Sequence, residues 1–295
     1  ISCPGAGETG FAALGKILNG EVNPSGKLAD TYVYDLTATP AFNNFGDFTY
    51  ENMNEFGWEE ANPFSGETKQ NDVNFVNYVE NIYVGYKFYE TAYAEAEAGN
   101  MDFDYDKVVQ YPFGYGLSYT DFDWKVVNAP NKKEKLTADS QIEITVQVTN
   151  TGQVPGKDVV QLYYTPPYEP GGIEKSAVVL ADYGKTKELA PGESEEITLA
   201  VKAEDMASYD YNDSNHNGFI GYELDSGIYG FSIRKNAHEI ADIPGAEVSL
   251  TLKENVQYPT DPYTGAVVSN KMTGKNAIDG VGIDGTDSGQ DINYM

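Results

Sequence analysis

The sequence predicts an α+β fragment of more than one domain: a helical, aromatic-rich first part, an all-β sandwich and an extended tail. Residues 1–120 combine one amphipathic helix with Gly-, Asn- and Tyr-rich sequence. From residue 121 the apolar residues recur with a period of two, which is typical of strands. From residue 254 this periodicity is lost and Gly, Asp, Asn and Thr dominate. We therefore expect domains over residues 1–120 and 121–253 and a linker over 254–295.

Composition and charge exclude several classes of function. The 295 residues carry 19 basic and 46 acidic side chains, a net charge of −27. Such a chain repels phosphate backbones and anionic lipid surfaces, so neither nucleic acid nor a membrane is an expected partner. The single cysteine, Cys3, excludes an internal disulfide and leaves the compartment open. Two histidines offer little for a Ser-His-Asp or multi-histidine metal site.

The first expected element is a helix over residues 8–18. Phe11, Leu14 and Leu18 recur at three- and four-residue spacing, and Gly20 stands where a helix terminator is expected. One amphipathic helix cannot bury its apolar face alone. We therefore expect a partner layer from sequence that precedes Ile1, as in a chain cut from something longer.

Residues 41–66 form a long polar segment that contains many aromatic residues. Long loops without regular structure are uncommon unless they are functional or disordered. Phe45, Phe48 and Trp58 are candidates to stack on a sugar ring; the alternative is that they pin the loop to its domain. The Tyr- and Val-rich residues 78–91 predict a strand-like or mixed segment, followed by an acidic, alanine-rich stretch to residue 106.

The run "YPFGYGLSYT" at residues 111–120 predicts a rigid aromatic turn at a domain junction. Pro112 fixes φ, and Gly114 and Gly116 permit backbone conformations closed to other residues. The aromatic rings could form a sugar platform, but a junction needs buried aromatic area more than it needs a ligand. We expect a structural role for Pro112, Gly114 and Gly116, with a Cβ at either glycine producing a clash.

Beyond residue 120, seven short runs have alternating or β-branched residues and are bounded by Gly, Pro, Asn or Asp. Seven strands in this length predict a β-sandwich of the immunoglobulin or fibronectin type, and the absence of paired cysteines favours fibronectin. The runs are FDWKVV, QIEITVQVTN, KDVVQLYYT, SAVVLADY, EEITLAVKAED, GIYGFSIRK and EVSLTLKE.

Within the sandwich, residues 213–224 partly match a calcium loop of the EF-hand kind. Asp213, Asn215 and Asn217 occupy the first, third and fifth positions, where oxygen-bearing side chains converge on a hard cation. The twelfth position is Leu224, so the bidentate carboxylate is out of register. The alternative is an Asn-rich turn satisfied by its own backbone. No other cofactor is expected.

Three motifs, in order and spacing, resemble the family 3 glycoside hydrolases: "PGAGETGFAALGKILNGEVNPSGKLADT", "ENIYVGYKFYET" and "YPFGYGLSYTDFDW". They are similar to the C-terminal part of that family's α/β sandwich domain. The segments "VTNTGQVPGKDVVQLYY", "ELAPGESEEITL" and "LDSGIYGFSIRKNAHEI" resemble its fibronectin type III-like domain. The tail resembles the connector of the branch in which the catalytic barrel follows the β-sandwich. The resemblance thus implies a partial α/β sandwich, a fibronectin-like sandwich and a linker toward a (β/α)8 barrel.

The resemblance implies a retaining β-glycosidase of the β-glucosidase kind, a hydrolase of carbohydrate metabolism that acts on β-linked oligosaccharides or glycosides. The family places its aspartate nucleophile on the barrel and, in many members, a glutamate acid/base on the α/β sandwich. Neither can be carried onto a residue of this chain, so no catalytic residue is assigned and the chain alone is expected to be inactive. Its expected partners are the barrel and the rest of the α/β sandwich of the same enzyme. The alternative is a free-standing carbohydrate-binding or adhesion module, with or without calcium.

Overall fold

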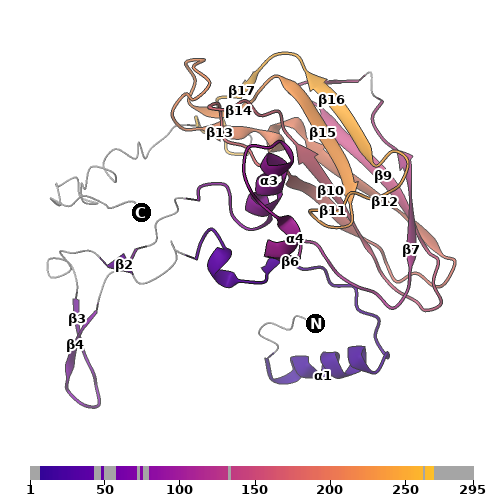
Figure 1. The fold of residues 1–295 in the computed structure, drawn as a ribbon, viewed down its shortest axis with the longest axis horizontal. Coiled ribbons are helices and arrows are strands. Elements are labelled where there is room, and N and C mark those ends of the chain that lie inside the picture. The colour runs from indigo at the N-terminus through magenta and orange to yellow at the C-terminus, as the bar shows by residue number, and fades with distance from the viewer. Residues whose placement is uncertain are drawn as a thin grey trace.

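All seven of the alternating runs form strands of a β-sandwich (Figure 1). The computed structural model describes residues 7–42, 48–49, 58–71, 74–75, 80–131, 134–261 and 263–268. One sheet has five strands in the order β11-β10-β15-β16-β8 and the other has three in the order β12-β9-β7. Their bounds are β7 Phe122–Asn128, β8 Lys135–Leu136, β9 Gln141–Asn150, β10 Val159–Thr165, β11 Val179–Lys185, β12 Ser194–Lys202, β15 Gly227–Arg234 and β16 Glu247–Leu252.

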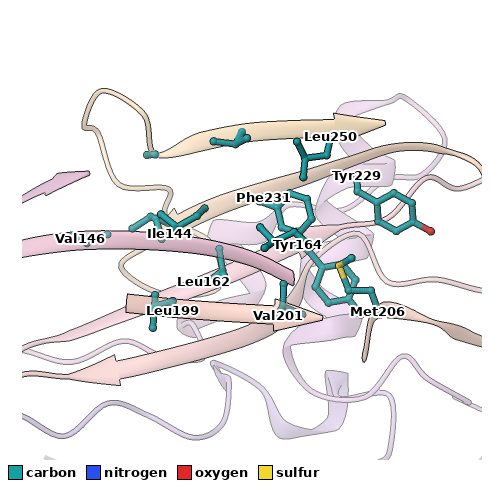
Figure 2. Close-up of a cluster of buried hydrophobic side chains, with 14 of the residues drawn as sticks. Ile144, Val146, Leu162, Tyr164, Leu199, Val201, Met206, Tyr229, Phe231 and Leu250 are labelled. Atoms are coloured by element: carbon teal, nitrogen blue, oxygen red, sulfur yellow. The ribbon is translucent and has the colours of Figure 1, made fainter. Parts of the chain in front are cut away.

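The core lies between these two sheets and follows from the period of two. In β9, Ile142, Ile144, Val146 and Val148 are buried, whereas Gln141 and Glu143 face solvent. Side chains on opposite faces of a strand alternate, so one face fills the core and the other stays polar. Figure 2 shows this core, in which side chains of both sheets meet; its labelled members are Ile144, Val146, Leu162, Tyr164, Leu199, Val201, Met206, Tyr229, Phe231 and Leu250.

A third sheet, not expected from the sequence, closes one end of the sandwich. It has the order β13-β14-β17, and a 3-10 helix η2 precedes it. Its strands are too short for a periodic pattern to stand out. The last of them also pairs residues that the sequence places in the linker. The bounds are η2 Ala203–Met206, β13 Ser208–Asp210, β14 Gly221–Leu224 and β17 Val256–Tyr258.

The part before residue 121 contains short elements, of which α3 and α4 lie against the sandwich (Figure 1). β1 pairs with β6, β2 with β5 and β3 with β4, each as an antiparallel two-stranded sheet. The bounds are α1 Gly7–Leu18, β1 Tyr32–Val33, η1 Leu36–Ala38, β2 Phe48–Thr49, β3 Trp58–Ala61, β4 Thr68–Asn71, β5 Asn74–Phe75, α3 Tyr86–Glu97, α4 Tyr105–Val108 and β6 Val109–Tyr111. The described helices include none that is long and apolar enough to span a bilayer.

Helix α3 corrects the strand-like interpretation of residues 78–91. The aromatic and β-branched residues of this stretch favour a strand, but its second half belongs to a twelve-residue helix that continues into the alanine-rich stretch and ends at Glu97. Alanine and glutamate have high helix propensity, and Tyr89 and Ala92 bury one face of the helix. Helix propensity and burial at three-residue spacing therefore outweigh the local β preference.

The interior strand β10, which lies between β11 and β15, is buried on both faces. Val160, Leu162 and Tyr164 point into the core, yet Gln161 and Tyr163 on the opposite face are also no more than 3% exposed. A sandwich strand normally shows one face to water. The preceding part of the chain covers this face, and that contact is where the candidate site lies.

Candidate functional site

The sequence-predicted turn at residues 111–120 packs directly on the outer face of β10. Gly114 has a φ of +83°, and its carbonyl accepts a hydrogen bond from Gln161 Nε2 at 3.2 Å. Gln161 Nε2 also donates to the carbonyl of Lys235 at 2.9 Å. A Cβ on Gly114 would lie 2.2 Å from Gln161 Oε1, closer than any van der Waals contact allows. Glycine is thus required here both by φ and by the approach of a buried side chain. We call the contact of residues 111–120 and α3 with the sandwich the aromatic junction.

The second glycine of the turn faces another part of the chain. A Cβ on Gly116 would lie 2.3 Å from the carbonyl oxygen of Gly26. Pro112 begins the turn, since its carbonyl accepts from Tyr115 N at 3.2 Å. The backbone of Leu28 is hydrogen-bonded to the turn: its N–H donates to the carbonyl of Tyr115 at 2.8 Å. This geometry supports the structural role expected for Pro112, Gly114 and Gly116, which substitution must test.

Aromatic rings fill the space between α3 and the sandwich. The Tyr86 ring lies 4.6 Å from Phe113 and 6.2 Å, edge to face, from Tyr163. The hydroxyl of Tyr86 accepts a hydrogen bond from the amide of Leu180 at 3.0 Å, and Tyr163 donates its own to Gln161 at 2.8 Å. Buried tyrosines need such partners for their polar end. The junction is therefore a packed and satisfied interior rather than an open platform.

A buried carboxylate ties α3 to the last part of the sandwich. Glu90 is 2% exposed; its Oε1 accepts from the Tyr105 hydroxyl at 2.6 Å, and its Oε2 is hydrogen-bonded to His238 Nδ1 at 3.0 Å. The His238 ring stacks on Tyr105 with centroids 3.8 Å apart. Burial, and then the negative charge of Glu90, raise the pKa of Tyr105. Tyr105 therefore stays a hydrogen-bond donor over the whole neutral range.

An ion pair and a hydrogen bond add two further links between the part before residue 121 and the sandwich. Lys27 Nζ lies 3.3 Å from Asp158 Oδ1, and the other Asp158 oxygen accepts from Trp124 Nε1 at 2.9 Å. The hydroxyl of Thr120 donates to the amide oxygen of the fully buried Asn150 at 2.7 Å. Partly buried charges stay stable only when they are paired. Both parts of the chain thus contribute groups that the other part satisfies.

The structure describes no side chain of the three expected sugar-contact residues, Phe45, Phe48 and Trp58. Phe45 lies outside the described residues. Phe48 pairs with Phe75 and Trp58 with Asn71 in small two-stranded sheets, and their side chains are not among those that the structure describes. The sugar-contact role of these three residues stays a prediction.

The calcium-loop residues form a closed network at the β13–β14 connection. Asp213 Oδ1 accepts from Gly218 N at 3.0 Å, and the amides of Asn215 and Asn217 donate to Glu223 at 3.0 and 2.6 Å. Glu223 is fully buried, and this burial, together with the neighbouring charges of Asp225 and Asp210, raises the pKa of its carboxyl. Within the described ranges, no three His, Cys, Asp or Glu side chains are arranged to hold a metal ion. Calcium binding stays a prediction.

Sequence reasoning missed the Glu90 network, although a signal was present. Tyr86, Glu90 and Tyr93 recur at spacings of four and three, so they share one face of a helix. An acid among aromatic residues on such a face indicates a buried carboxylate with a partner. Reading residues 78–91 as strand-like hid this spacing, and nothing local to His238 marks it as the partner.

Comparisons with known proteins find one domain match and several similar β-glucosidases. Residues 158–237 match the model of the fibronectin type III-like domain. The chain is 41% identical over 213 residues to β-glucosidase A of Butyrivibrio fibrisolvens, covering 69% of this chain and 21% of that protein. It is 36% identical over 225 residues to a β-glucosidase of Ruminococcus albus, covering 76% of this chain and 19% of that protein. The chain thus spans about a fifth of the length of these relatives.

Solved structures extend the match across the junction. A β-glucosidase from Paenibacillus barengoltzii superposes with a TM-score of 0.63 and 31% identity, covering 95% of this chain and 26% of the other. The family 3 β-glucosidase of Bifidobacterium adolescentis superposes with a TM-score of 0.59 and 27% identity, covering 87% of this chain and 30% of that one. The similarity therefore includes residues on both sides of residue 120.

Proposed function

The chain belongs to the family 3 glycoside hydrolases, and from this premise we propose that it is a non-catalytic scaffold of a retaining β-glucosidase-like enzyme. The parent would hydrolyse O-glycosidic bonds of β-linked glycosides or oligosaccharides. The chain would supply the end of an α/β sandwich domain, the fibronectin-like sandwich and the beginning of a connector to the catalytic barrel.

The aromatic junction is the observation that carries this proposal. It covers the outer face of β10 and joins the two parts through Gly114 and Glu90, and the ion pair of Lys27 with Asp158 adds a further link. A scaffold must hold its parts in a fixed geometry, since small errors in placement cost large factors in rate. A packed junction with satisfied polar groups provides that rigidity, whereas a flexible linker would not.

The surface before residue 121 supports docking against the rest of the parent. On α1, Phe11 and Leu18 are 61% and 67% exposed, and elsewhere in this part of the chain Leu36 and Leu117 are 71% and 70% exposed. An amphipathic helix gains its stability from burying its apolar face. We propose that the remaining α/β sandwich of the same enzyme covers α1, because the matched region is only about a fifth of these relatives, which carry additional sequence.

The chain by itself should not hydrolyse glycosides. Retaining hydrolysis needs a nucleophile and an acid/base with carboxyl groups roughly 5 Å apart. The family places the nucleophile on the barrel, which this sequence does not match. Glu90, the best-buried carboxylate of the junction, already has both oxygens engaged by Tyr105 and His238.

Hydrolysis of chromogenic substrates tests the proposal. The full-length enzyme that contains this sequence and the 295-residue chain should be assayed side by side with β-glucoside, β-xyloside and, as a stereochemical control, α-glucoside. We expect β-glycosidase activity in the full-length enzyme alone. Activity of the chain by itself would show that it holds a catalytic pair. A full-length enzyme inactive on both β-substrates would overturn the proposed activity and favour a binding module.

A further inference from the structure

A row of tyrosines crosses the third sheet at one end of the sandwich. Tyr209 of β13 pairs with Tyr222 of β14, and Tyr222 pairs in turn with Tyr258 of β17. Residues directly opposite one another on neighbouring strands share one face of a sheet. Tyr211 and Ile220 flank the row, just after β13 and just before β14. We call these five residues the tyrosine face.

The tyrosine face passes from the core of the sandwich into solvent. Leu224, two residues along β14 from Tyr222, is fully buried, and Tyr258 packs against the core. Tyr222, Tyr211 and Ile220 are 46%, 58% and 44% exposed. Exposed apolar and aromatic side chains that lie together mark an interaction surface, and tyrosine is enriched at such surfaces.

The loop beside the tyrosine face is ordered by hydrogen bonds. Glu223, on the opposite face of β14, accepts from the amide groups of Asn215 and Asn217 at 3.0 and 2.6 Å. These bonds fix the loop that runs from Tyr211 to Ile220. A surface that is already rigid loses little conformational entropy when a partner docks.

The rings are arranged for a protein partner rather than for a sugar. Tyr209 and Tyr222 meet edge to face, with centroids 5.0 Å apart and ring planes inclined by 67°. A sugar ring stacks on a flat ring face and needs hydrogen-bonding groups beside it. The amide groups of Asn215 and Asn217 in the adjoining loop are already engaged by Glu223. An uneven aromatic surface of this kind fits apolar side chains.

The course of the chain indicates which partner reaches this face. β17 is an edge strand of the sheet, and directly after it Thr260 and Val267 form an isolated bridge. The chain therefore continues from beside the tyrosine face. A linker of the length of residues 269–295 has a root-mean-square span of about 30 Å. A domain on such a linker meets the face at an effective concentration of about 1 mM, so a small patch is enough to hold it.

The remaining α/β sandwich is not placed to cover the tyrosine face. Figure 1 shows α1 and the third sheet at opposite ends of the sandwich. Asn23, just after α1, donates to the carbonyl of Pro155, beyond the end of β9, whereas Tyr258 donates to the carbonyl of Ala138, before β9 begins. A second copy of the chain is disfavoured as well, because each copy carries a net charge of −27.

We propose that the tyrosine face is the surface on which the catalytic barrel of the same enzyme docks. This inference rests on the proposed function, in which the chain leads through a connector to that barrel. Docking at this face sets the orientation of the barrel relative to the sandwich, which a linker alone does not fix.

Hydroxyl-radical footprinting, which measures the solvent exposure of individual side chains, tests this on the full-length enzyme and on the 295-residue chain. We expect Tyr211 and Tyr222 to be oxidised at least about fivefold more slowly in the full-length enzyme, because a docked surface excludes water. The matched control is Tyr183 on β11, which is 65% exposed and should change by less than about twofold. Equal oxidation of Tyr211 and Tyr222 in the two proteins, or equal protection of Tyr183, would overturn the proposal.

Photo-cross-linking identifies what covers the face. The full-length enzyme with p-benzoylphenylalanine in place of Tyr211 should form cross-links within one molecule to peptides of the barrel. Cross-links to the rest of the α/β sandwich, cross-links between two molecules, or no cross-link would each overturn the proposal. Protection of Tyr211 and Tyr222 in the 295-residue chain by cellotetraose would also overturn it and favour a sugar-binding face.

A variant tests whether the contact holds the barrel in place. Tyr222→Ser in the full-length enzyme should speed protease cleavage of the connector about tenfold, because truncating an anchoring tyrosine weakens an interface by about that factor. Tyr183→Ser is the control and should change the cleavage rate by less than about twofold. If Tyr222→Ser does not fold, Tyr211→Ser, which lies outside the strands, takes its place.

Cleavage of the Tyr222→Ser and Tyr183→Ser enzymes at the same rate would contradict the docking. Hydrolysis of a chromogenic β-glucoside by the same preparations separates this inference from the proposed function. An active full-length enzyme whose Tyr211 and Tyr222 stay fully exposed overturns the docking alone and leaves the proposed activity in place.

Discussion

At the scale of single residues, Gly114 has the most demanding surroundings of the junction. Its φ of +83° disfavours any side chain, and Gln161 occupies the space that a Cβ would need. Gly192 has nearly the same φ, +82°, but nothing within 4 Å of the added atom. The two positions therefore separate the cost of the backbone conformation from the cost of the clash.

We expect Gly192→Ala to cost about 1–2 kcal/mol and Gly114→Ala about 2–5 kcal/mol of unfolding free energy. The difference arises because Gln161 must move, which breaks its bonds to the carbonyls of Gly114 and Lys235. Urea unfolding of both variants measures it. Equal losses at the two positions would show that the contact with Gln161 contributes nothing.

The residue scale also shows how far the sequence could lead. The sequence predicted a turn that needs glycine at positions 114 and 116, because proline and two glycines in so short an aromatic run disfavour a helix or a strand. The sequence could not predict that Gln161 contacts Gly114, since Gln161 lies on a strand 47 residues later. Local chemistry thus identified the turn, and only the fold identifies what it touches.

At the scale of elements, α3 connects the first part of the chain to the sandwich through its buried hydrogen bonds. Tyr105→Phe should lower stability by about 1.5–3 kcal/mol, because it removes a donor from the buried Glu90 carboxylate. Tyr119→Phe is the control. Tyr119 is 52% exposed and its hydroxyl donates to the carbonyl of Ile17, so losing this hydroxyl should cost about 0.5 kcal/mol or less of unfolding free energy. Urea unfolding monitored by circular dichroism compares them. Losses in the opposite order would contradict the Glu90 network.

The elements of the sandwich were predicted better than those before it. Its predicted strands are six to ten residues long, and burial leaves a clear alternation in β9 and β16. The helix α3 and the strands β8, β13, β14 and β17 were missed because they are short or because their aromatic residues favour another structure. Tertiary contacts, which the sequence does not display, decide these elements.

At the scale of the whole molecule, buried tyrosines make the fold sensitive to alkaline pH. Burial raises the pKa of Tyr89 and Tyr258 to about 12, and it raises the pKa of others still further. These others include Tyr105, Tyr163, Tyr164 and Tyr229.

Since the pKa of an unfolded tyrosine is about 10, the stability from keeping these side chains protonated is complete below that pH. It is lost as the pH rises through the folded values, because the unfolded chain releases protons first. We expect the Tm to fall steadily above about pH 10, and tyrosinate absorbance to appear together with unfolding. Complete tyrosine ionisation in a chain that retains its near-ultraviolet circular dichroism would contradict this.

The double burial of β10 has a consequence for how the chain can be divided. Residue 120 separates two kinds of periodicity, but Gln161 and Tyr163 lie beneath residues that precede it. A polypeptide beginning at residue 121 would expose that surface to water and to other copies of itself. The break in sequence pattern is therefore not a place where folding can be interrupted, and the stretch from α3 through β16 should melt in one cooperative transition.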